Sequence, residues 1–340
     1  MKINGLTVSS KQKALMIAEE GQANQGDINI ALEMARFAKD SGADGIEYQL
    51  FFADEMYAKN DPGHKLYKSR ELQKDEIIEL IYKTHALGLL VQVAGLSPKI
   101  IELCTDNGAD VFVINATDLN NPEIIDATVD SGKPFWFATL MGTVGEIDWA
   151  VEYALTKNAK NFGLLHGQHV MSSSAGSGVP ANYLQLDCIS AMERKYGVTV
   201  GFVDHTATTF VPALAATLGA SCITKHLSPH EGWVGPDSSI CLSPKQWKVA
   251  KDILDYSYLA RGSSKELSIE ELGDKSLFRR SLHTTQELKA GSRLERSHLV
   301  ALRPGLDGIN PSMLAEVIGK NIYVDLLENE QLKSHHFFKS

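Results

Sequence analysis

The chain has 340 residues, of which 44% are hydrophobic and 22% charged, and its net charge is −9. This length suits one large barrel or a large domain with a small one, and the composition is that of an ordinary soluble protein. The acidic balance and the lack of a long Lys/Arg-rich run disfavour nucleic acid and anionic membranes as partners. No apolar run is long enough to span a bilayer, and the first residues lack the apolar stretch of a signal peptide. Together with four cysteines that show no CxxC spacing, this predicts a cytoplasmic protein with reduced thiols.

Eight short apolar runs with the composition of strands recur along the chain. They cover residues 13–21, 44–52, 88–96, 109–117, 134–142, 161–168, 199–206 and 220–228. The segments between them, such as NIALEMARFAKDSG and KDEIIELIYKTHALG, repeat apolar residues at helical spacing and end in a glycine suited to a C-cap. Eight strands that alternate with helices predict an α/β fold, a parallel (β/α)8 TIM barrel. A doubly wound open sheet is the competing architecture, and it is less favoured because no glycine-rich dinucleotide fingerprint follows the first strand.

Polar side chains gather at the carboxyl ends of these predicted strands. They are Glu19, Glu47, Gln49, Asn115, Thr117, Thr139, His166, Gln168, Asp204, His205, Lys225 and His226. In a barrel these ends meet at one mouth, where such enzymes place their chemistry. Strand ends are also polar simply because they exit to solvent, so each residue alone is ambiguous. We expect Thr139 and Lys225 to be among the residues that bind substrate.

Two histidines end the last two predicted strands. His205 and His226 would lie within reach of one ion, since neighbouring strands end side by side. Imidazole nitrogens suit a divalent metal, and two protein ligands leave positions open for water and substrate. His166 and Glu47 are further candidate ligands. For His166 the alternative is a buried histidine that hydrogen-bonds to the backbone.

The connections and the C-terminal part add three expectations. The long segments 52–72 and 167–185 would be lids or binding loops, and the SSSAGSG stretch within the second either presents amides to an anion or is simply flexible. After residue 262 the chain becomes polar and then rich in short strands and turns. We therefore predict a barrel domain at 1–265, a linker at 266–278 and a small β-rich domain at 279–340.

The order and spacing of several motifs resemble the sialic acid synthases over nearly the whole chain. The motifs are IAEEGQANQGD (17–27), GADGIEYQ (42–49), LLH (164–166), VGFVDHT (200–206), KH (225–226), GPD (235–237) and the tail RRS…RPG…GI (279–309). The resemblance implies a TIM barrel followed by an antifreeze-like (SAF) domain with a β-clip fold. It implies an enzyme that joins phosphoenolpyruvate to an N-acetylhexosamine-type aldehyde with the help of Mn²⁺ or Mg²⁺. It also implies a homodimer in which one chain's SAF domain covers the partner's barrel.

The sugar half of the family's site is matched residue by residue. The resemblance places His205 and His226 at the metal-ligand positions. Gln49 and Asp237 match positions that touch the sugar. Glu19 matches an acid implicated in sugar binding and proton handling, and Arg303 matches the arginine that reaches across the dimer toward the sugar's acyl group.

The phosphoenolpyruvate half is not matched. Glu47 and Val113 stand where the family usually has lysines, and Ala116, Ala138 and Val203 stand where it has serines. A phosphate and a carboxylate need such donors, and each lost charged hydrogen bond costs roughly 1.5–3 kcal/mol. We therefore expect weak phosphoenolpyruvate binding in the usual mode.

Three functions are compatible with these residues. The first is a sialic acid synthase-like enzyme with an altered donor, which is either phosphoenolpyruvate held by Lys65, Lys68 or the SSSAGSG stretch, or a less charged keto compound. The second is a metal-dependent sugar isomerase, epimerase or lyase in which Glu47 is a ligand or general base beside a metal on His205 and His226, with His166 as a further candidate ligand. The third is a non-catalytic paralogue that binds a sugar, which the retained sugar-half residues disfavour.

Overall fold

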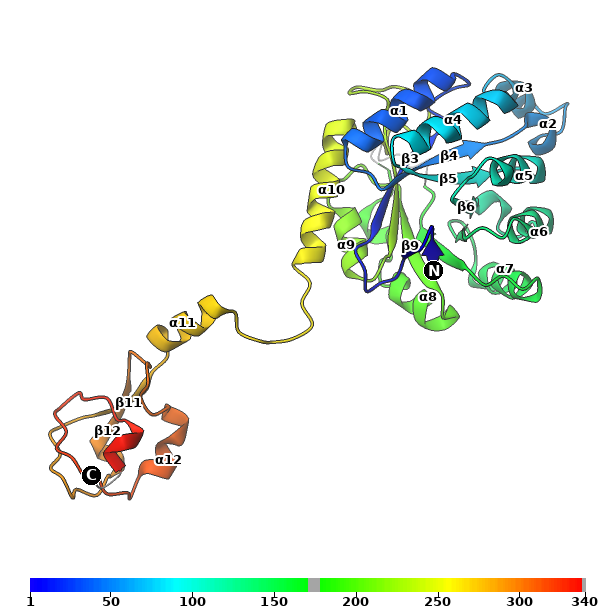
Figure 1. Cartoon of the computed structure of the whole chain (residues 1–340). Helices are drawn as coiled ribbons and strands as arrows, with labels where there is room; N and C mark the ends of the chain where they lie inside the picture. Colours follow the sequence, from blue (N-terminus) through cyan, green and yellow to red (C-terminus); the bar gives the residue numbers. More distant parts are fainter. Residues whose placement is uncertain (171–177, 338–340) are drawn as a thin grey trace. The chain divides into compact units, whose positions relative to one another are not determined.

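In a computed structural model of the chain, which describes residues 1–170 and 178–337, eight parallel strands close into a barrel (Figure 1). The order around the barrel is β10, β3, β4, β5, β6, β7, β8 and β9. The strands are β3 (Leu15–Gly21), β4 (Gly45–Leu50), β5 (Leu90–Gly95), β6 (Val111–Ile114), β7 (Phe135–Ala138), β8 (Phe162–Gly167), β9 (Thr199–Asp204) and β10 (Cys222–His226). Each lies inside one of the eight predicted runs, so the predicted (β/α)8 barrel is confirmed.

Helices follow the strands and form the outer layer of the barrel. They are α1 (Ile28–Asp40), α2 (Ala53–Met56), α3 (Pro62–Lys68), α4 (Lys74–Ala86), α5 (Pro98–Asp106), α6 (Pro122–Asp130), α7 (Val144–Thr156), α8 (Cys188–Tyr196), α9 (Val211–Thr217) and α10 (Pro244–Leu259). Local sequence sets several of their starts: the Asp27 side chain accepts from the Asn29 N–H at α1, and Thr143 and Glu146 form a capping box at α7. None of the helices that the structure describes is long and apolar enough to cross a membrane.

Two apolar layers result from the alternation of side chains along each strand. Residues such as Ile17, Val113 and Trp136 fill the barrel interior, whereas Ile46 and Phe202 pack between the strands and the helices. Because successive residues of a strand point to opposite faces, only every second strand-end residue can face the barrel mouth. The position of a residue in this alternation therefore determines whether its side chain can reach the cavity.

A short N-terminal hairpin, β1 (Lys2–Ile3) and β2 (Leu6–Thr7), precedes the barrel and is absent from the sequence-based expectations. Its Ile3 and the following Val8 are buried in the same apolar cluster as the barrel interior. The Met1 amino group also donates to Thr199 Oγ1 at the start of β9, over 3.0 Å. The hairpin thus packs at the amino ends of the strands, which leaves the carboxyl ends for the site.

The chain divides into two compact units, Met1–Arg261 and Gly262–Ser340. The second unit contains α11 (Ile269–Phe278), the antiparallel pair β11 (Ser281–Thr284) and β12 (Leu299–Leu302), and α12 (Leu314–Val317). It has a core of its own, made of Leu282, Leu288, Leu294, Leu299, Val317, Ile322, Leu326 and Leu332. The segment predicted as a linker is largely helical, because Ser268 and Glu271 form a capping box that starts α11.

Candidate active site

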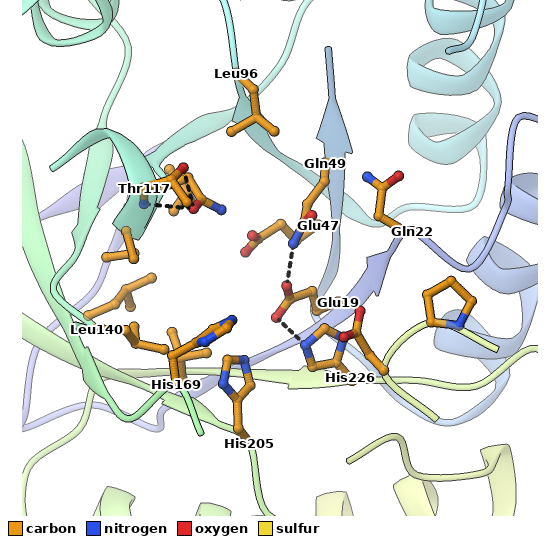
Figure 2. A pocket seen from close by; sticks show the side chains of 18 of the residues that line it. Glu19, Gln22, Glu47, Gln49, Leu96, Thr117, Leu140, His169, His205 and His226 are labelled. Atoms are coloured by element: carbon orange, nitrogen blue, oxygen red, sulfur yellow. Dashed lines mark hydrogen bonds and ion pairs between the residues drawn. The ribbon is translucent and has the colours of Figure 1, made fainter. Parts of the chain in front are cut away.

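A cavity of about 420 Å³ opens at the carboxyl ends of the barrel strands (Figure 2). Its polar lining comes from several different strands and the loops that follow them. These residues are Glu19, Gln22, Glu47, Gln49, Tyr67, Arg70, Asn115, Thr117, His169, His205, His226 and Asp237. A cavity of this size that holds several convergent polar groups has the form of a small-molecule site.

Three buried side chains converge on one side of this cavity. Glu19 ends β3, His226 ends β10 and His205 follows β9, and one ligand atom from each lies within 4.8 Å of the other two. The rings of His205 and His226 have their centroids 5.2 Å apart, and His226 Nε2 is 3.4 Å from Glu19 Oε2. Figure 2 shows the three side chains pointing toward one another.

The hydrogen bonds of the two imidazoles leave nitrogen atoms available. His205 Nδ1 lies 3.0 Å from the Gln168 carbonyl, to which it donates, so its Nε2 keeps a lone pair. His226 Nδ1 is buried without any hydrogen-bond partner among the described residues. A buried polar atom without a partner is rare and costly, and a bound ligand is one way to satisfy it. Two imidazoles and a carboxylate form a donor set that fits a divalent cation.

Burial shapes the protonation of this cluster. It lowers the pKa of His226 to about 4, and burial together with the neighbouring His226 and His169 holds the pKa of His205 well below its ordinary value. Both rings are therefore neutral at pH 7, the form that ligates metals. Burial, reinforced by the negative charge of Asp237, raises the pKa of Glu19 to about 8. A cation among these groups would favour the carboxylate form of Glu19.

A second buried carboxyl group lies beside the cluster. Glu47 is paired with Glu19 in the register of β3 and β4, is 4% exposed, and accepts a hydrogen bond from Gln92 Nε2. Burial and the nearby Glu19 raise the pKa of Glu47 well above its ordinary value. Gln49, two residues along β4, donates from Nε2 to Glu19 Oε1 over 2.9 Å. Two carboxyl groups with shifted pKa values in one cavity suit acid–base chemistry.

Asp237 closes the polar side of the cavity. A side chain at Gly21 would place its Cβ 3.2 Å from Asp237 Oδ2 and 3.2 Å from His226 Cε1. Gly21 also has a positive φ of +61°, which only glycine adopts readily. Gly21, two residues after Glu19, therefore permits the close approach that brings Asp237 next to the cluster.

The opposite side of the cavity is apolar. It is lined by Leu96, Val113, Ala116, Ala138, Leu140, Met141, Leu165 and Val203. The five positions at which the resemblance implies a departure from the family's donor-binding residues, which are Glu47, Val113, Ala116, Ala138 and Val203, all line the cavity. These side chains therefore contribute to the surface that a bound molecule would meet.

Comparison with known proteins identifies the family. The model of the NeuB family matches residues 34–265, more than half of the chain. The chain belongs to the NeuB family. Its relatives include an N,N'-diacetyllegionaminic acid synthase of Legionella pneumophila, 26% identical over 98% of both chains. A pseudaminic acid synthase of Helicobacter pylori is 25% identical over 97% of this chain and 99% of its own.

The solved structures agree on the fold. An N-acetylneuraminic acid synthetase from Leptospira borgpetersenii, crystallised with citrate, matches with a TM-score of 0.72 and 24% identity, over 81% of this chain and 94% of its own. A spore coat polysaccharide biosynthesis protein E from Chromobacterium violaceum reaches a TM-score of 0.77 at 18% identity, over 96% of this chain and 100% of its own. This NeuB family member is therefore an enzyme of the synthase class on a TIM barrel.

Three of the predicted site residues do not reach the NeuB-type cavity, because they point to the outer face of their strands. His166 is buried, and its Nε2 hydrogen-bonds to the Leu184 carbonyl over 3.1 Å. Thr139 donates from Oγ1 to the Leu165 carbonyl. Neither residue lines the cavity, so the structure lends no support to His166 as a metal ligand or to Thr139 as a substrate-binding residue.

Lys225 is the third. It is fully buried, forms an ion pair with Asp204 at 3.1 Å, and also donates to the Thr206 carbonyl. Burial lowers the pKa of Lys225, but a charged partner and backbone acceptors surround it. Lys225 therefore links β9 and β10 within the barrel wall, and it does not line the cavity.

Other predicted residues lie elsewhere. Arg303 belongs to the second unit, where it is exposed and its guanidinium carbon lies 5.9 Å from the Phe278 ring centroid. Most of the SSSAGSG stretch lies outside the described residues. Lys65 and Lys68, considered above as donor-binding residues, do not line the cavity.

Four polar lining residues were missed: Gln22, Tyr67, Arg70 and His169. Tyr67 and Arg70 come from the long segment 52–72, and His169 from the start of the long segment 167–185. The length of both segments was the available signal. Their sequence does not show which side chains turn inward, because periodicity is lost outside strands and helices.

Proposed function

We propose that this protein is a metal-dependent sialic acid synthase-like enzyme. It would form a carbon–carbon bond between a three-carbon donor and an amino-sugar aldehyde in nonulosonic acid biosynthesis. The convergence of Glu19, His205 and His226 at the mouth of a NeuB-family barrel carries the proposal. The relatives named as legionaminic and pseudaminic acid synthases support the substrate class.

The metal would be a divalent cation, Mn²⁺ or Mg²⁺, held by His205 and His226 with Glu19 beside them. The two nitrogen donors favour Mn²⁺, because Mg²⁺ prefers oxygen ligands. Such an ion polarises a carbonyl oxygen and so makes the aldehyde carbon more electrophilic.

The remaining polar residues suit a sugar. Gln49 and Asp237 flank Glu19 and offer an amide and a carboxylate to hydroxyl or N-acetyl groups. Glu47 lines the cavity with its pKa raised well above the ordinary value by burial and by Glu19, which favours its protonated form, so it is suited to donate a proton to a developing alkoxide or enolate. Glu19 and Glu47 are the catalytic residues of this proposal.

The donor is proposed to bind differently from phosphoenolpyruvate in the rest of the family. Neither lysine nor serine lines the cavity among the described residues, and the buried carboxyl group of Glu47 offers no positive charge to an anionic donor. Such a surface suits a small donor with an apolar methyl or methylene group, such as a 2-keto acid.

An isomerase or lyase remains the alternative chemistry for this site. The observation in its favour is the pairing of Glu47 and Glu19, which suits proton transfer on a single sugar. Against it, Glu47 is held by Gln92 and is not among the residues that converge on the metal-type cluster.

The metal is tested by removing its ligands. We expect wild-type protein loaded with Mn²⁺ and dialysed to retain about one ion per chain, and His205→Ala combined with His226→Ala to lose it. His230→Ala, which removes an exposed histidine outside the cavity, is the matched control and should retain the ion. Equal metal content in the double variant and the wild type would contradict the proposal.

The reaction is tested with the same wild-type protein. It is incubated with Mn²⁺ and a panel of hexosamines, with pyruvate, with phosphoenolpyruvate or with neither. With pyruvate as the donor, carbon–carbon bond formation gives a product whose mass is the sum of the masses of the sugar and pyruvate. With phosphoenolpyruvate and water, the same product forms and inorganic phosphate is released. A sugar product of unchanged mass without any donor would instead establish the isomerase alternative.

A further inference from the structure

Arg70 gives this cavity a positive charge that the proposed mechanism does not use. It is the one lysine or arginine that lines the cavity within residues 1–170 and 178–337. The carboxyl groups of Glu19, Glu47 and Asp237 line the same cavity, yet no ion pair joins Arg70 to any carboxylate that the structure describes. A half-buried guanidinium without a carboxylate partner is free to bind an anion.

The backbone around Arg70 is held in place from two sides. On one side, Gly26, which follows β3, packs against it: a Cβ at Gly26 would lie 2.8 Å from the Ser69 carbonyl oxygen and 3.1 Å from Arg70 Cα. On the other side, the Arg70 N–H donates to the Tyr67 carbonyl over 2.9 Å. Tyr67 in turn lines the cavity and packs its ring against Phe51, at 5.1 Å between centroids.

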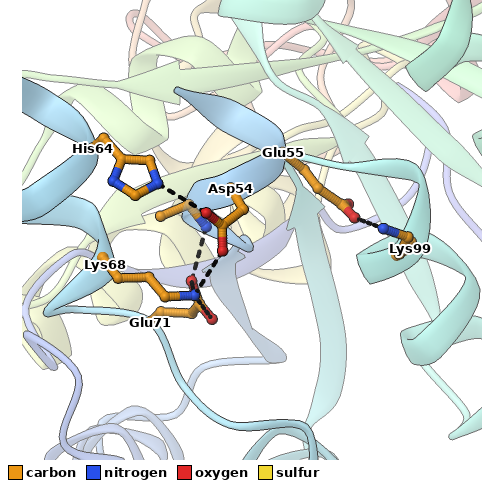
Figure 3. A network of polar contacts seen from close by, with 7 residues as sticks. Asp54, Glu55, His64, Lys68, Glu71 and Lys99 are labelled. Carbon is orange, nitrogen blue, oxygen red and sulfur yellow. Dashed lines mark hydrogen bonds and ion pairs between the residues drawn. The ribbon is translucent and has the colours of Figure 1, made fainter. Parts of the chain in front are cut away.

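A network of charged residues anchors the same segment to the barrel (Figure 3). Lys68 bridges Asp54 and Glu71, at 3.1 and 3.0 Å, and Glu71 accepts from the Ala53 N–H over 2.8 Å. Glu55 pairs with Lys99 at the start of α5. Lys68 is thus engaged by two carboxylates and does not line the cavity, whereas Arg70 of the same segment does.

We propose that Arg70 binds an anionic oxygen group of the substrate, a carboxylate or a phosphate, at the mouth of the cavity. The inference rests on the proposed function, because Arg70 would bind the charged end of the same substrate whose reactive carbon would lie near Glu19 and His226. A planar guanidinium offers two parallel N–H donors that match both oxygens of a carboxylate or phosphate. The hydroxyl-bearing Tyr67 ring stands beside it as a second polar neighbour. The site thereby replaces cations that the apolar side of the cavity lacks.

The test measures binding and not turnover. Wild type, Arg70→Ala and Arg70→Lys are titrated with pyruvate or with inorganic phosphate in the presence of Mg²⁺, and dissociation constants are obtained from ligand NMR line widths. Lys65→Ala is the matched control, since it removes one positive charge from the same segment at a position outside the cavity. The two probes separate a carboxylate from a phosphate.

We expect at least one probe to bind and Arg70→Ala to weaken that probe by on the order of tenfold or more, the loss expected for a charged hydrogen-bonding pair. The affinity of Arg70→Lys should lie between those of the wild type and Arg70→Ala, because lysine keeps the charge and loses the paired donors. Lys65→Ala should bind as the wild type does. The inference is overturned if neither probe binds the wild type, if Arg70→Ala binds equally well, or if Lys65→Ala loses as much affinity.

Failure of the Arg70 assignment can be distinguished from failure of the proposed function. Anion binding through Arg70 in a protein that retains no metal and makes no product contradicts the proposed reaction alone. Product formation by wild type, with Arg70→Ala unchanged in both affinity and rate, contradicts the Arg70 assignment alone.

Discussion

Glu47 distinguishes this site from the family pattern at the scale of single residues. It is buried at the mouth of the barrel, one strand away from Glu19, and its partner is the neutral side chain of Gln92. A buried carboxyl group without a cationic partner favours its protonated form. At this position the site therefore presents a neutral acid or a negative charge, and never the positive charge that the resemblance implies for other members.

Phosphoenolpyruvate is accordingly predicted to bind poorly. Calorimetry with phosphoenolpyruvate and Mn²⁺ should show a dissociation constant well above the micromolar range, because the apolar side of the cavity offers no charged hydrogen bonds to a phosphate. Glu47→Gln should improve whatever binding remains, because at nearly constant shape it removes the acid whose carboxylate form would repel a phosphate. Micromolar binding by the wild type, or phosphate release at ordinary synthase rates, would mean that the substitutions are compensated elsewhere.

Sequence reasoning at this scale succeeded where strand alternation and the motifs agreed. Glu19, Glu47, Gln49, His205 and His226 were predicted at the mouth and line the cavity. His166, Thr139 and Lys225 are equally close to strand ends in the sequence. They point to the other face of the sheet, so proximity to a strand end is insufficient without the phase of the alternation.

The phase of the alternation along a strand follows once one interior residue of that strand is known. Leu165 of β8 and Cys222 of β10 are buried in the barrel interior. Residues one or three positions away along the same strand therefore point to the outer face, and residues two or four positions away point inward. Lys225 lies three residues beyond Cys222 and therefore on the outer face, whereas His226 lies four beyond and faces inward. The sequence does not reveal which apolar residue of each run is interior until the strand register is known.

At the scale of elements, the regular parts were the predictable ones. All eight barrel strands fall within predicted runs, because continuous apolar runs with helical segments between them are typical of parallel sheets buried on both faces. The hairpin β1–β2 was missed because each strand has two residues, too few to show a period. The segment between β4 and α4 was predicted only as a lid or binding loop. It contains α2 and α3, and α3 starts with local signals, the Asp61 N-cap and Pro62. The ion pair between Glu55 and Lys99 of α5 is a tertiary contact that the sequence does not reveal.

Gly26 links this segment to the site. Its φ of +89° is strained for any other residue, and a Cβ would collide with the backbone at Ser69 and Arg70. Gly26→Ala should therefore destabilise the protein by about 1–3 kcal/mol and displace Arg70. Thermal unfolding should show the loss of stability, and anion titration should show weakened binding.

Gly132→Ala is the matched control for the backbone effect. Gly132 also has a positive φ, +66°, but nothing lies within 4 Å of a Cβ there. The Gly132→Ala substitution should lower the stability of the protein without changing its affinity for the anion. An unchanged anion affinity in Gly26→Ala, alongside lowered stability, would show that the close packing at Gly26 does not position Arg70.

At the scale of the whole molecule, the chain consists of two units that each have a core. The second unit buries eight apolar residues in its own cluster, yet leaves Leu277, Phe278 and Leu306 exposed at 54%, 59% and 55%. Arg303 lies over the ring of Phe278 in the same neighbourhood. Exposed apolar side chains grouped around an arginine are common at sites of protein association.

We propose that the second unit is an antifreeze-like domain that covers the barrel mouth of a partner chain in a homodimer, with Arg303 contributing to the sugar site. Light scattering should then report a dimer. Arg303→Ala should raise the KM for the sugar by on the order of tenfold, the effect of one charged hydrogen bond, while the dimer persists. Arg293→Ala, which removes an exposed arginine elsewhere in the same unit, should leave the KM unchanged. A monomer in solution whose activity survives deletion of residues 262–340 would contradict the proposal, because the barrel alone would then contain the complete site.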